Sequence, residues 1–229
     1  MTKHQKKNIL VVAAHPDDEI LGCGGSLLKY KKRGYSINLI FFTDGVGSRN
    51  KKNLIKKKKS RLNAAIKVSK ILGCKKPMFN QFPDNELDKI SNLKLVKIIE
   101  KEILRIKPEI IFTHFKNDLN IDHKKINQAL VTACRPQKNR IIKKILFFEV
   151  PSSTEWQIDK SKNIFNPNWF ENITHEFKMK IKAIKCYKEE LRKSPHPRSI
   201  DGITSLNKWR GSTIGVKYAE AFMLGRFIS

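Results

Sequence analysis

NILVVAAHPDDEILGCGGSLLKYKKRG, residues 8–34, joins three structural signals in one stretch. The apolar run 8–14 is short and rich in β-branched side chains, which predicts a buried strand. The segment from Ile20 to Gly34 has the pattern of a helix that ends at a glycine. Between them lies AHPDDE, residues 14–19, with one histidine and three acids at the end of the strand. A strand, a polar turn and a helix in this order predict the opening unit of an α/β fold.

The alternation of strands and helices continues along the chain. Further strands are expected at 36–45, 77–82, 108–115 and 143–150, and further helices at 58–73, 92–107 and 122–135. Apolar strands separated by helices predict a Rossmann-like, mostly parallel sheet with helices on both faces.

The pattern weakens after Pro151. We expect mostly loop over 152–169, a long helix over 175–192, and a final forty residues that are irregular apart from a short helix near the end. The chain is therefore expected to form one domain, 1–229, with an α/β core at 1–150 and an irregular C-terminal lobe at 151–229 that completes the substrate site.

Composition limits the cellular setting. The chain has 229 residues, of which 40% are hydrophobic, so it is long enough to bury a core. No apolar stretch reaches the roughly 20 residues of a membrane helix, and the apolar run near the start meets charge too early for a signal peptide. Four scattered cysteines without a CxxC pair are typical of a reduced protein, so we expect a cytoplasmic location.

The formal net charge is +26. A phosphate-rich partner would explain it, such as nucleic acid, a nucleotide sugar or an anionic membrane face. A composition rich in Lys, Ile and Asn throughout explains it equally, and we favour that explanation. The one dense cluster, residues 49–61, is expected to be a mobile loop that leads into a helix.

Most chemically interesting side chains directly follow a predicted strand. Because the carboxyl ends of parallel strands meet at one edge of a sheet, we expect these side chains in one crevice. In order along the chain they are His15, Asp17, Asp18, Glu19, Thr43, Asp44, Asp84, Asn85, His114, Asp118, Asn120, Asp122 and His123.

Two histidines and several carboxylates suit a divalent metal, with Zn²⁺ as the default and Fe²⁺ or Mn²⁺ as alternatives. His15, His123 and one acid of the pair Asp17 and Asp18 could supply the three ligands of a catalytic zinc site, and the other acid could act as a general base. A helix N-cap would also explain the acids of HPDD. The second polar loop, HFKNDLNIDH at 114–123, favours a metal site over a cap.

These motifs resemble those of the LmbE-like, PIG-L zinc de-N-acetylases. The resemblance rests on AHPDDEILGCGG (14–25), FFTDG (41–45), the segment Arg61 to Gly73, FPDN (82–85) and DLNIDH (118–123). EVPSSTEW and SPHPRS extend it more weakly toward the C-terminus. The resemblance implies that the protein removes an acetyl group from a small-molecule N-acetylated amino sugar.

The resemblance also implies a function for each matching residue. It gives the role of base to Asp17 and assigns the metal to His15, Asp18 and His123. It implies that Arg61 contacts the substrate and that Asp84 binds sugar hydroxyls. For the two acids of the second motif, Asp118 and Asp122, support of a ligand histidine or of an ordered loop is expected.

This chain departs from the family pattern at two positions. It has Asn120 where many members carry a histidine that stabilises the intermediate or protonates the amine, and Ala64 where an acid is frequent. We hypothesise that His196 supplies the missing imidazole, with Arg198 beside it for an anionic or hydroxyl-rich substrate. A structural role for the proline-flanked loop is the alternative.

The oxyanion stabiliser is left open among three side chains, which are His196, Asn120 and His114. A packed, hydrogen-bonded role is at least as plausible for His114, because it lies at the end of a strand. The glycines of GCGG, residues 22–25, do not form GxGxxG, so we expect close packing of helix on sheet and no dinucleotide site.

The expected function is metal-dependent hydrolysis of an N-acetyl group from an amino sugar or a GlcNAc-type conjugate, including nucleotide- or phosphate-linked ones. One alternative is a basic nucleic-acid-binding protein, which would bind with a steep salt dependence. Another is an inactive sugar-binding relative. No nucleic-acid partner is expected, because no basic stripe is interleaved with aromatic residues. Assembly as a homo-oligomer is left open.

Overall fold

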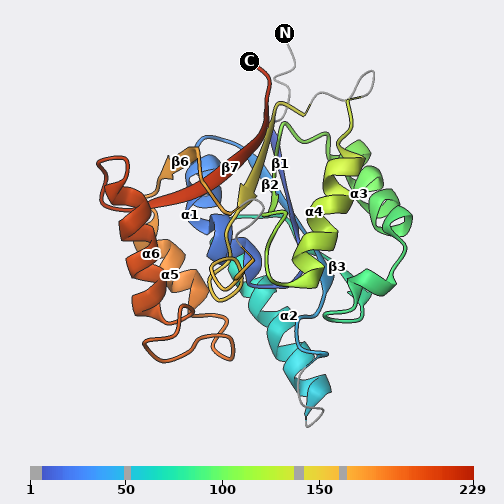
Figure 1. Ribbon diagram of the computed structural model, residues 1–229, viewed down its shortest axis with the longest axis horizontal. Helices are drawn as coiled ribbons and strands as arrows, with labels where there is room; N and C mark the ends of the chain where they lie inside the picture. Colours follow the sequence, from blue (N-terminus) through green and yellow to red (C-terminus); the bar gives the residue numbers. More distant parts are fainter. Residues whose placement is uncertain (1–6, 49–52, 137–141, 160–163) are drawn as a thin grey trace.

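Within residues 7–48, 53–136, 142–159 and 164–229, which this computed structural model describes, a seven-stranded sheet runs through the molecule (Figure 1). The strand order is β3-β2-β1-β4-β5-β7-β6. The strands are β1 (Asn8–Ala13), β2 (Ser36–Thr43), β3 (Met78–Phe82), β4 (Ile110–His114), β5 (Lys144–Phe148), β6 (Trp169–Asn172) and β7 (Ala219–Phe227). Strands β1 to β5 pair in parallel, and β7 pairs antiparallel with both β5 and β6.

Strand β1 lies inside the sheet, between β2 and β4, and is buried on both faces, which is why its sequence is continuously apolar. Because successive side chains of a strand point to opposite faces, β1 contributes to two separate cores. Ile9, Val11 and Ala13 belong to one core, and Leu10 and Val12 belong to the other. All five are fully buried.

Helices cover both faces, as predicted (Figure 1). They are α1 (Asp18–Lys32), α2 (Leu54–Ile71), α3 (Asn92–Ile106), α4 (Ile121–Ala133), α5 (Phe177–Ile184) and α6 (Ile200–Ser212), with a short 3-10 helix η1 (Leu87–Lys89). Helices α1, α2, α5 and α6 supply Leu27, Ala65, Ala183 and Ile203 to the first core, and α3 and α4 supply Ile99 and Ile126 to the second. No helix in the described segments is long and apolar enough to cross a membrane.

The glycines of GCGG allow helix α1 to approach its neighbours closely. A Cβ on Gly22 would lie 2.4 Å from a ring carbon of Phe148 in β5, and one on Gly25 would lie 2.7 Å from Ile173. Real Cβ atoms do not approach so closely, so any side chain at these positions would push the helix away. The expectation of close packing is therefore confirmed, and it fixes the start of α1 beside the strand ends.

The C-terminal part is more regular than the sequence predicted. The long helix expected over 175–192 is wrong, since α5 ends at Ile184. The following turns bring Tyr187 inward, where its hydroxyl donates to buried Glu19 at 2.7 Å. In the final forty residues, where irregular chain with one short helix was expected, residues 200–212 form the helix α6 and residues 219–227 form the strand β7.

Strand β7 was missed because its partners are distant in the sequence. It pairs with β5, about eighty residues earlier, and with β6, about fifty residues earlier. The part of the chain after Pro151 therefore contributes two strands, β6 and β7, to the same sheet as the N-terminal strands.

The Lys-rich cluster also differs from expectation. Residues 49–52 lie outside the described segments, but from Leu54 onward the cluster is the first part of α2 and not a loop. Lysine has a good helix propensity, which is consistent with this outcome. Lys58 pairs with Asp44 at 2.6 Å, so one positive charge of the cluster is met within the protein.

Candidate metal centre and active site

The polar turns after the strands meet at one edge of the sheet, as predicted. His15 and Asp18 lie between β1 and α1, Asp84 follows β3, and Asp118 and His123 come from the loop after β4 and the start of α4. Each of these side chains is at most 7% exposed. Several ionisable groups are thus buried together, which requires compensating partners.

Three potential ligand atoms form an almost equilateral triangle. His15 Nδ1 lies 3.2 Å from His123 Nε2 and 3.3 Å from Asp18 Oδ2, and His123 Nε2 lies 3.4 Å from Asp18 Oδ2. A tetrahedral zinc ion with metal–ligand distances of about 2.0–2.1 Å separates its ligand atoms by about 3.3–3.4 Å. The three residues therefore fit one face of such a coordination sphere, which leaves one position open.

The second nitrogen of each histidine faces a carboxylate. His15 Nε2 lies 3.1 Å from Asp84 and 3.2 Å from Asp122, and His123 Nδ1 lies 3.0 Å from Asp118. Carboxylates in this position fix the tautomer and the orientation of a metal-ligating imidazole. The expected support of ligand histidines by Asp118 and Asp122 is consistent with this geometry.

A second group of potential ligand atoms comprises His15, Asp84 and Asp122. The two carboxylates of this group already accept hydrogen bonds from the protein. Asp122 accepts the backbone N–H groups of Asn85 and Leu87, and Asp84 accepts the N–H and hydroxyl of Ser48. In the first group, Asp18 accepts a single backbone N–H, that of His15, at its Oδ2 atom, and its Oδ1 atom is buried without a hydrogen-bond partner among the described residues. The first group is therefore the better metal site.

The buried acids of the site favour positive charge among them. Burial alone would lower the pKa of His123, but Asp18 and Asp118 outweigh burial and raise that pKa to about 9. Burial opposes ionisation of Asp18 as well, yet the neighbouring His123 holds its pKa well below its ordinary value. A cation in the triangle would take the place of these protons.

His114 supports the site as a packed ring. It is fully buried, stacks on His123 at 3.8 Å between centroids, and accepts the N–H of Ala14 at its Nε2 atom. Because Nε2 accepts a hydrogen bond, the proton of neutral His114 lies on Nδ1. Burial and the neighbouring His123 hold the pKa of His114 well below its ordinary value, so the ring stays neutral.

Asp17 points toward two arginines. Its Oδ1 atom lies 2.9 Å from Arg61 Nη2, and its Oδ2 atom lies 3.0 Å from Arg198 Nη1. The carboxylate is 1% exposed, and burial raises its pKa, although both arginines oppose the rise. No sequence pattern indicates that the predicted base and the two predicted substrate contacts touch one another.

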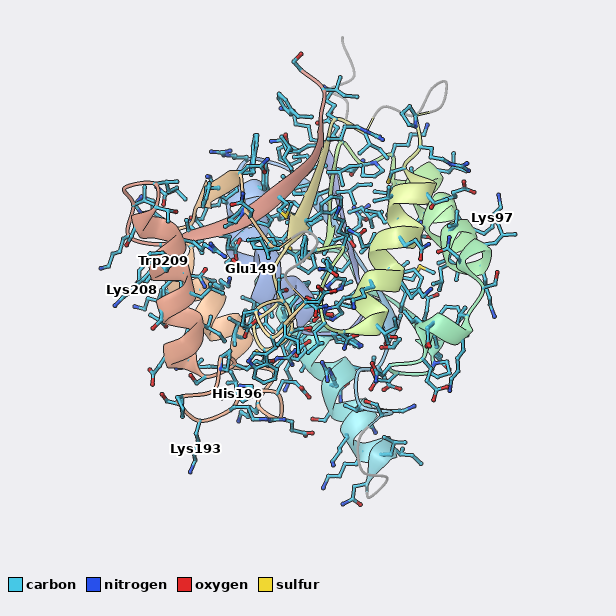
Figure 2. All side chains as sticks on the ribbon, viewed as in Figure 1. Lys97, Glu149, Lys193, His196, Lys208 and Trp209 are labelled. Atoms are coloured by element: carbon cyan, nitrogen blue, oxygen red, sulfur yellow. The ribbon has the colours of Figure 1, made fainter. Side chains whose placement is uncertain are left out.

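Two further candidates have structural partners. The Asn120 side chain caps α4 by accepting the N–H of Asp122 at 2.8 Å. His196 lies in the loop before α6 (Figure 2), where its Nδ1 atom accepts the N–H of Arg198 and its ring meets Trp156 edge-on. None of these three contacts is made with a residue of the ligand triangle, and a catalytic role for His196 stays a prediction.

Sequence reasoning missed four residues that hold the site. The hydroxyls of Ser153 and Thr154 donate to Asp118, Glu190 pairs with Arg61 at 3.0 Å, and Tyr187 holds Glu19. EVPSSTEW was noticed as a family segment, but its hydroxyls carried no spacing signal that would point to Asp118.

Comparison with known proteins finds a matching family and a related sequence. The family described as PIG-L: GlcNAc-PI de-N-acetylase matches residues 10–134. An uncharacterized deacetylase of Escherichia coli (strain K12), YaiS, is 32% identical over 192 residues, which cover 81% of this chain and 92% of that protein.

Solved structures share the fold. The N,N'-diacetylchitobiose deacetylase from Pyrococcus horikoshii has a TM-score of 0.74 at 20% identity, covering 95% of this chain and 83% of that one. GalB, a 4-carboxy-2-hydroxymuconate hydratase from Pseudomonas putida KT2440, has a TM-score of 0.78 at 20% identity, covering 97% and 98%. One fold thus serves two reactions, so the fold alone does not fix the chemistry. The family match and the sequence relative together show that this chain belongs to the PIG-L family of de-N-acetylases.

Proposed function

We propose that this protein is a divalent-metal-dependent hydrolase that removes the acetyl group from an N-acetylated amino sugar. The observation that carries the proposal is the triangle of His15, Asp18 and His123, with sides of 3.2–3.4 Å. Zn²⁺ suits two imidazoles and one carboxylate best, and Fe²⁺ or Mn²⁺ could use the same ligands.

An ion bound there would polarise the acetyl carbonyl and lower the pKa of water beside it. The chain supplies the remaining functions. Asp17, next to the ligand Asp18, is the group proposed to take a proton from the attacking water and deliver it to the leaving amine. Burial moves the pKa of Asp17 upward, in the direction that suits a base near neutral pH.

The substrate class is supported by the family and by a related deacetylase structure. The matched family is named for GlcNAc-PI, and the Pyrococcus structure is that of a diacetylchitobiose deacetylase. Asp84, proposed to meet sugar hydroxyls, lies at the site but is held by Ser48 and His15. His196 and Asn120 remain the proposed oxyanion stabilisers. A cytoplasmic location and a single 229-residue domain complete the proposal, and the four cysteines are free thiols.

The test is release of acetate. Protein loaded with Zn²⁺, Fe²⁺ or Mn²⁺ is incubated with N-acetyl sugars, their nucleotide- and phosphate-linked forms, and chitobiose. We expect acetate from at least one of these, loss of activity after chelation, and recovery on adding metal. Acetate release that survives complete metal removal would contradict the proposal, as would hydration of an unsaturated acid without any deacetylation.

Metal content gives a second, independent measurement. His15→Ala is expected to lose stoichiometric metal because it removes one corner of the triangle. His175→Ala is the matched control, since His175 is exposed, precedes α5 and is not part of the triangle. Full metal occupancy in His15→Ala would rule out the ligand set.

A further inference from the structure

We propose that Arg61 and Arg198 are positioning residues that hold the Asp17 carboxylate between them, one guanidinium on each oxygen. The proposal rests on the proposed function, in which Asp17 is the base. It replaces the sequence-based idea that these two arginines bind the substrate. We call the three side chains the Asp17 clamp.

Arg61 is a fixed support. It projects from α2 and is 6% exposed. Its Nε donates to the Pro16 carbonyl at 2.8 Å, its Nη1 donates to the Gly45 carbonyl at 2.7 Å, and its Nη2 lies 2.9 Å from Asp17 Oδ1. The guanidinium is therefore bound to the same turn that carries Asp17, through backbone as well as side chain.

Gly45 leaves room for this guanidinium. Its φ of 68° lies in the left-handed region that favours glycine, and a Cβ there would come within 2.8 Å of the Arg61 guanidinium. The FFTDG motif thus has a steric function at its last residue. It lets the backbone after β2 approach the flat face of Arg61.

Arg198 holds the other oxygen from the opposite end of the chain. Its Nη1 lies 3.0 Å from Asp17 Oδ2, and its Nε donates to the Pro151 carbonyl at 3.2 Å. Its side chain is 16% exposed, so it is the more accessible half of the clamp.

Glu190 balances the charge of the clamp. It lies 3.0 Å from Arg61 and 3.6 Å from Arg198, so two guanidiniums face two carboxylates. An arginine that binds an anionic substrate would not be expected to have its charge already neutralised by carboxylates of the protein. The contacts fit the support of Asp17 better than the capture of substrate phosphate.

Asp17 needs such support for two reasons. Its φ of 124° is unfavourable for a residue with a Cβ, and such a conformation persists only where surrounding contacts impose it. Its carboxylate must also turn away from the adjacent ligand Asp18, although the two are neighbours in the chain. A planar guanidinium, unlike an ammonium, holds a carboxylate by direction as well as by charge.

The test compares Arg198→Ala and Arg198→Lys with the wild type in metal-loaded protein. We expect kcat to fall by about 10²-fold, the loss associated with small misplacements of catalytic groups, with KM and metal content nearly unchanged. Arg198→Lys should recover little of the lost kcat. Millimolar guanidinium added to Arg198→Ala should restore part of kcat, because the vacated position is partly exposed. Arg192→Ala, an exposed arginine of the same segment, is the control and should keep wild-type kinetics.

A rise in KM at constant kcat in Arg198→Ala would overturn the proposal in favour of substrate binding. Unchanged kinetics would overturn it outright.

A double-mutant cycle separates this proposal from the proposed function. The shifts in thermal unfolding midpoint of Asp17→Asn, Arg198→Ala and the double variant are measured on the protein as purified, without substrate. We expect the double shift to be smaller than the sum of the single shifts, because the two residues share one contact. Additive shifts would refute the clamp even if the enzyme is active. If wild-type protein releases no acetate but the shifts are non-additive, the proposed function fails and the contact stands.

Discussion

Replacing Asp118 by Asn should weaken metal binding without unfolding the site. Asp118 is fully buried and touches four groups. It lies 3.0 Å from His123 Nδ1, accepts the N–H of Asn120 at 2.9 Å, and accepts the hydroxyls of Ser153 and Thr154. Each of these partners can donate a hydrogen bond, and the carboxylate has two oxygens that can accept them.

Asparagine cannot serve the same partners. It has one acceptor oxygen, and its NH₂ group would face donors on the other side. If the amide oxygen keeps accepting the hydroxyls of Ser153 and Thr154, the Nδ1 atom of His123 no longer faces an acceptor. The tautomer of His123 is then no longer fixed. Loss of such a support for a ligand histidine typically lowers metal affinity by about 10- to 100-fold, or about 1.4–2.7 kcal/mol.

The assay is competition for Zn²⁺ between the protein and a chromophoric chelator at fixed pH. The matched control is Asp88→Asn, the same chemical change on an exposed carboxylate. We expect the control to bind like wild type and Asp118→Asn to bind at least about 10-fold more weakly. Equal affinities for all three proteins would show that Asp118 does not act through His123.

Three further outcomes are expected. Gly22→Ala should lower the free energy of unfolding in urea by about 1–3 kcal/mol, because the new methyl would overlap Phe148; unchanged stability would contradict the packing. In chelator-treated protein, burial would lower the pKa of His123, but neighbouring acids raise it to about 9, above the ordinary 6.5. The stabilisation contributed by protonated His123 is therefore complete below pH 6.5 and is lost as the pH rises through about 9. Urea titrations of the chelator-treated protein should show the free energy of unfolding falling over that range. A free energy of unfolding that does not change over that range would refute the raised pKa of His123. Lys180→Met should lower the free energy of unfolding in urea by about 3–5 kcal/mol, because it removes the cation that lies 2.7 Å from buried Glu220. Adding Glu220→Gln should recover part of this loss. A loss below about 1 kcal/mol in Lys180→Met would contradict a stabilising role for the pair.

The sequence alone determined the N-terminal fold and the metal-ligand candidates. Continuous apolar runs such as 8–14 identify strands that are buried on both faces, and parallel strands place their carboxyl ends together. The sequence therefore predicts that His15, Asp18 and His123 lie at one edge of the sheet. Their position follows from local pattern and topology.

Only the tertiary structure decided how these groups are held. Arg198 meets Asp17 across 181 positions of the chain, and β7 joins a sheet whose other strands end long before it. Neither contact has a local pattern, because side-chain pairing over such distances depends on how the turns pack. Tertiary structure also decides which aspartates are metal ligands and which hold the ligand histidines, since the carboxylates are chemically identical and differ only in the hydrogen-bond donors around them. A chain pattern specifies which groups are near a strand end, whereas the packed backbone specifies the direction in which each one points.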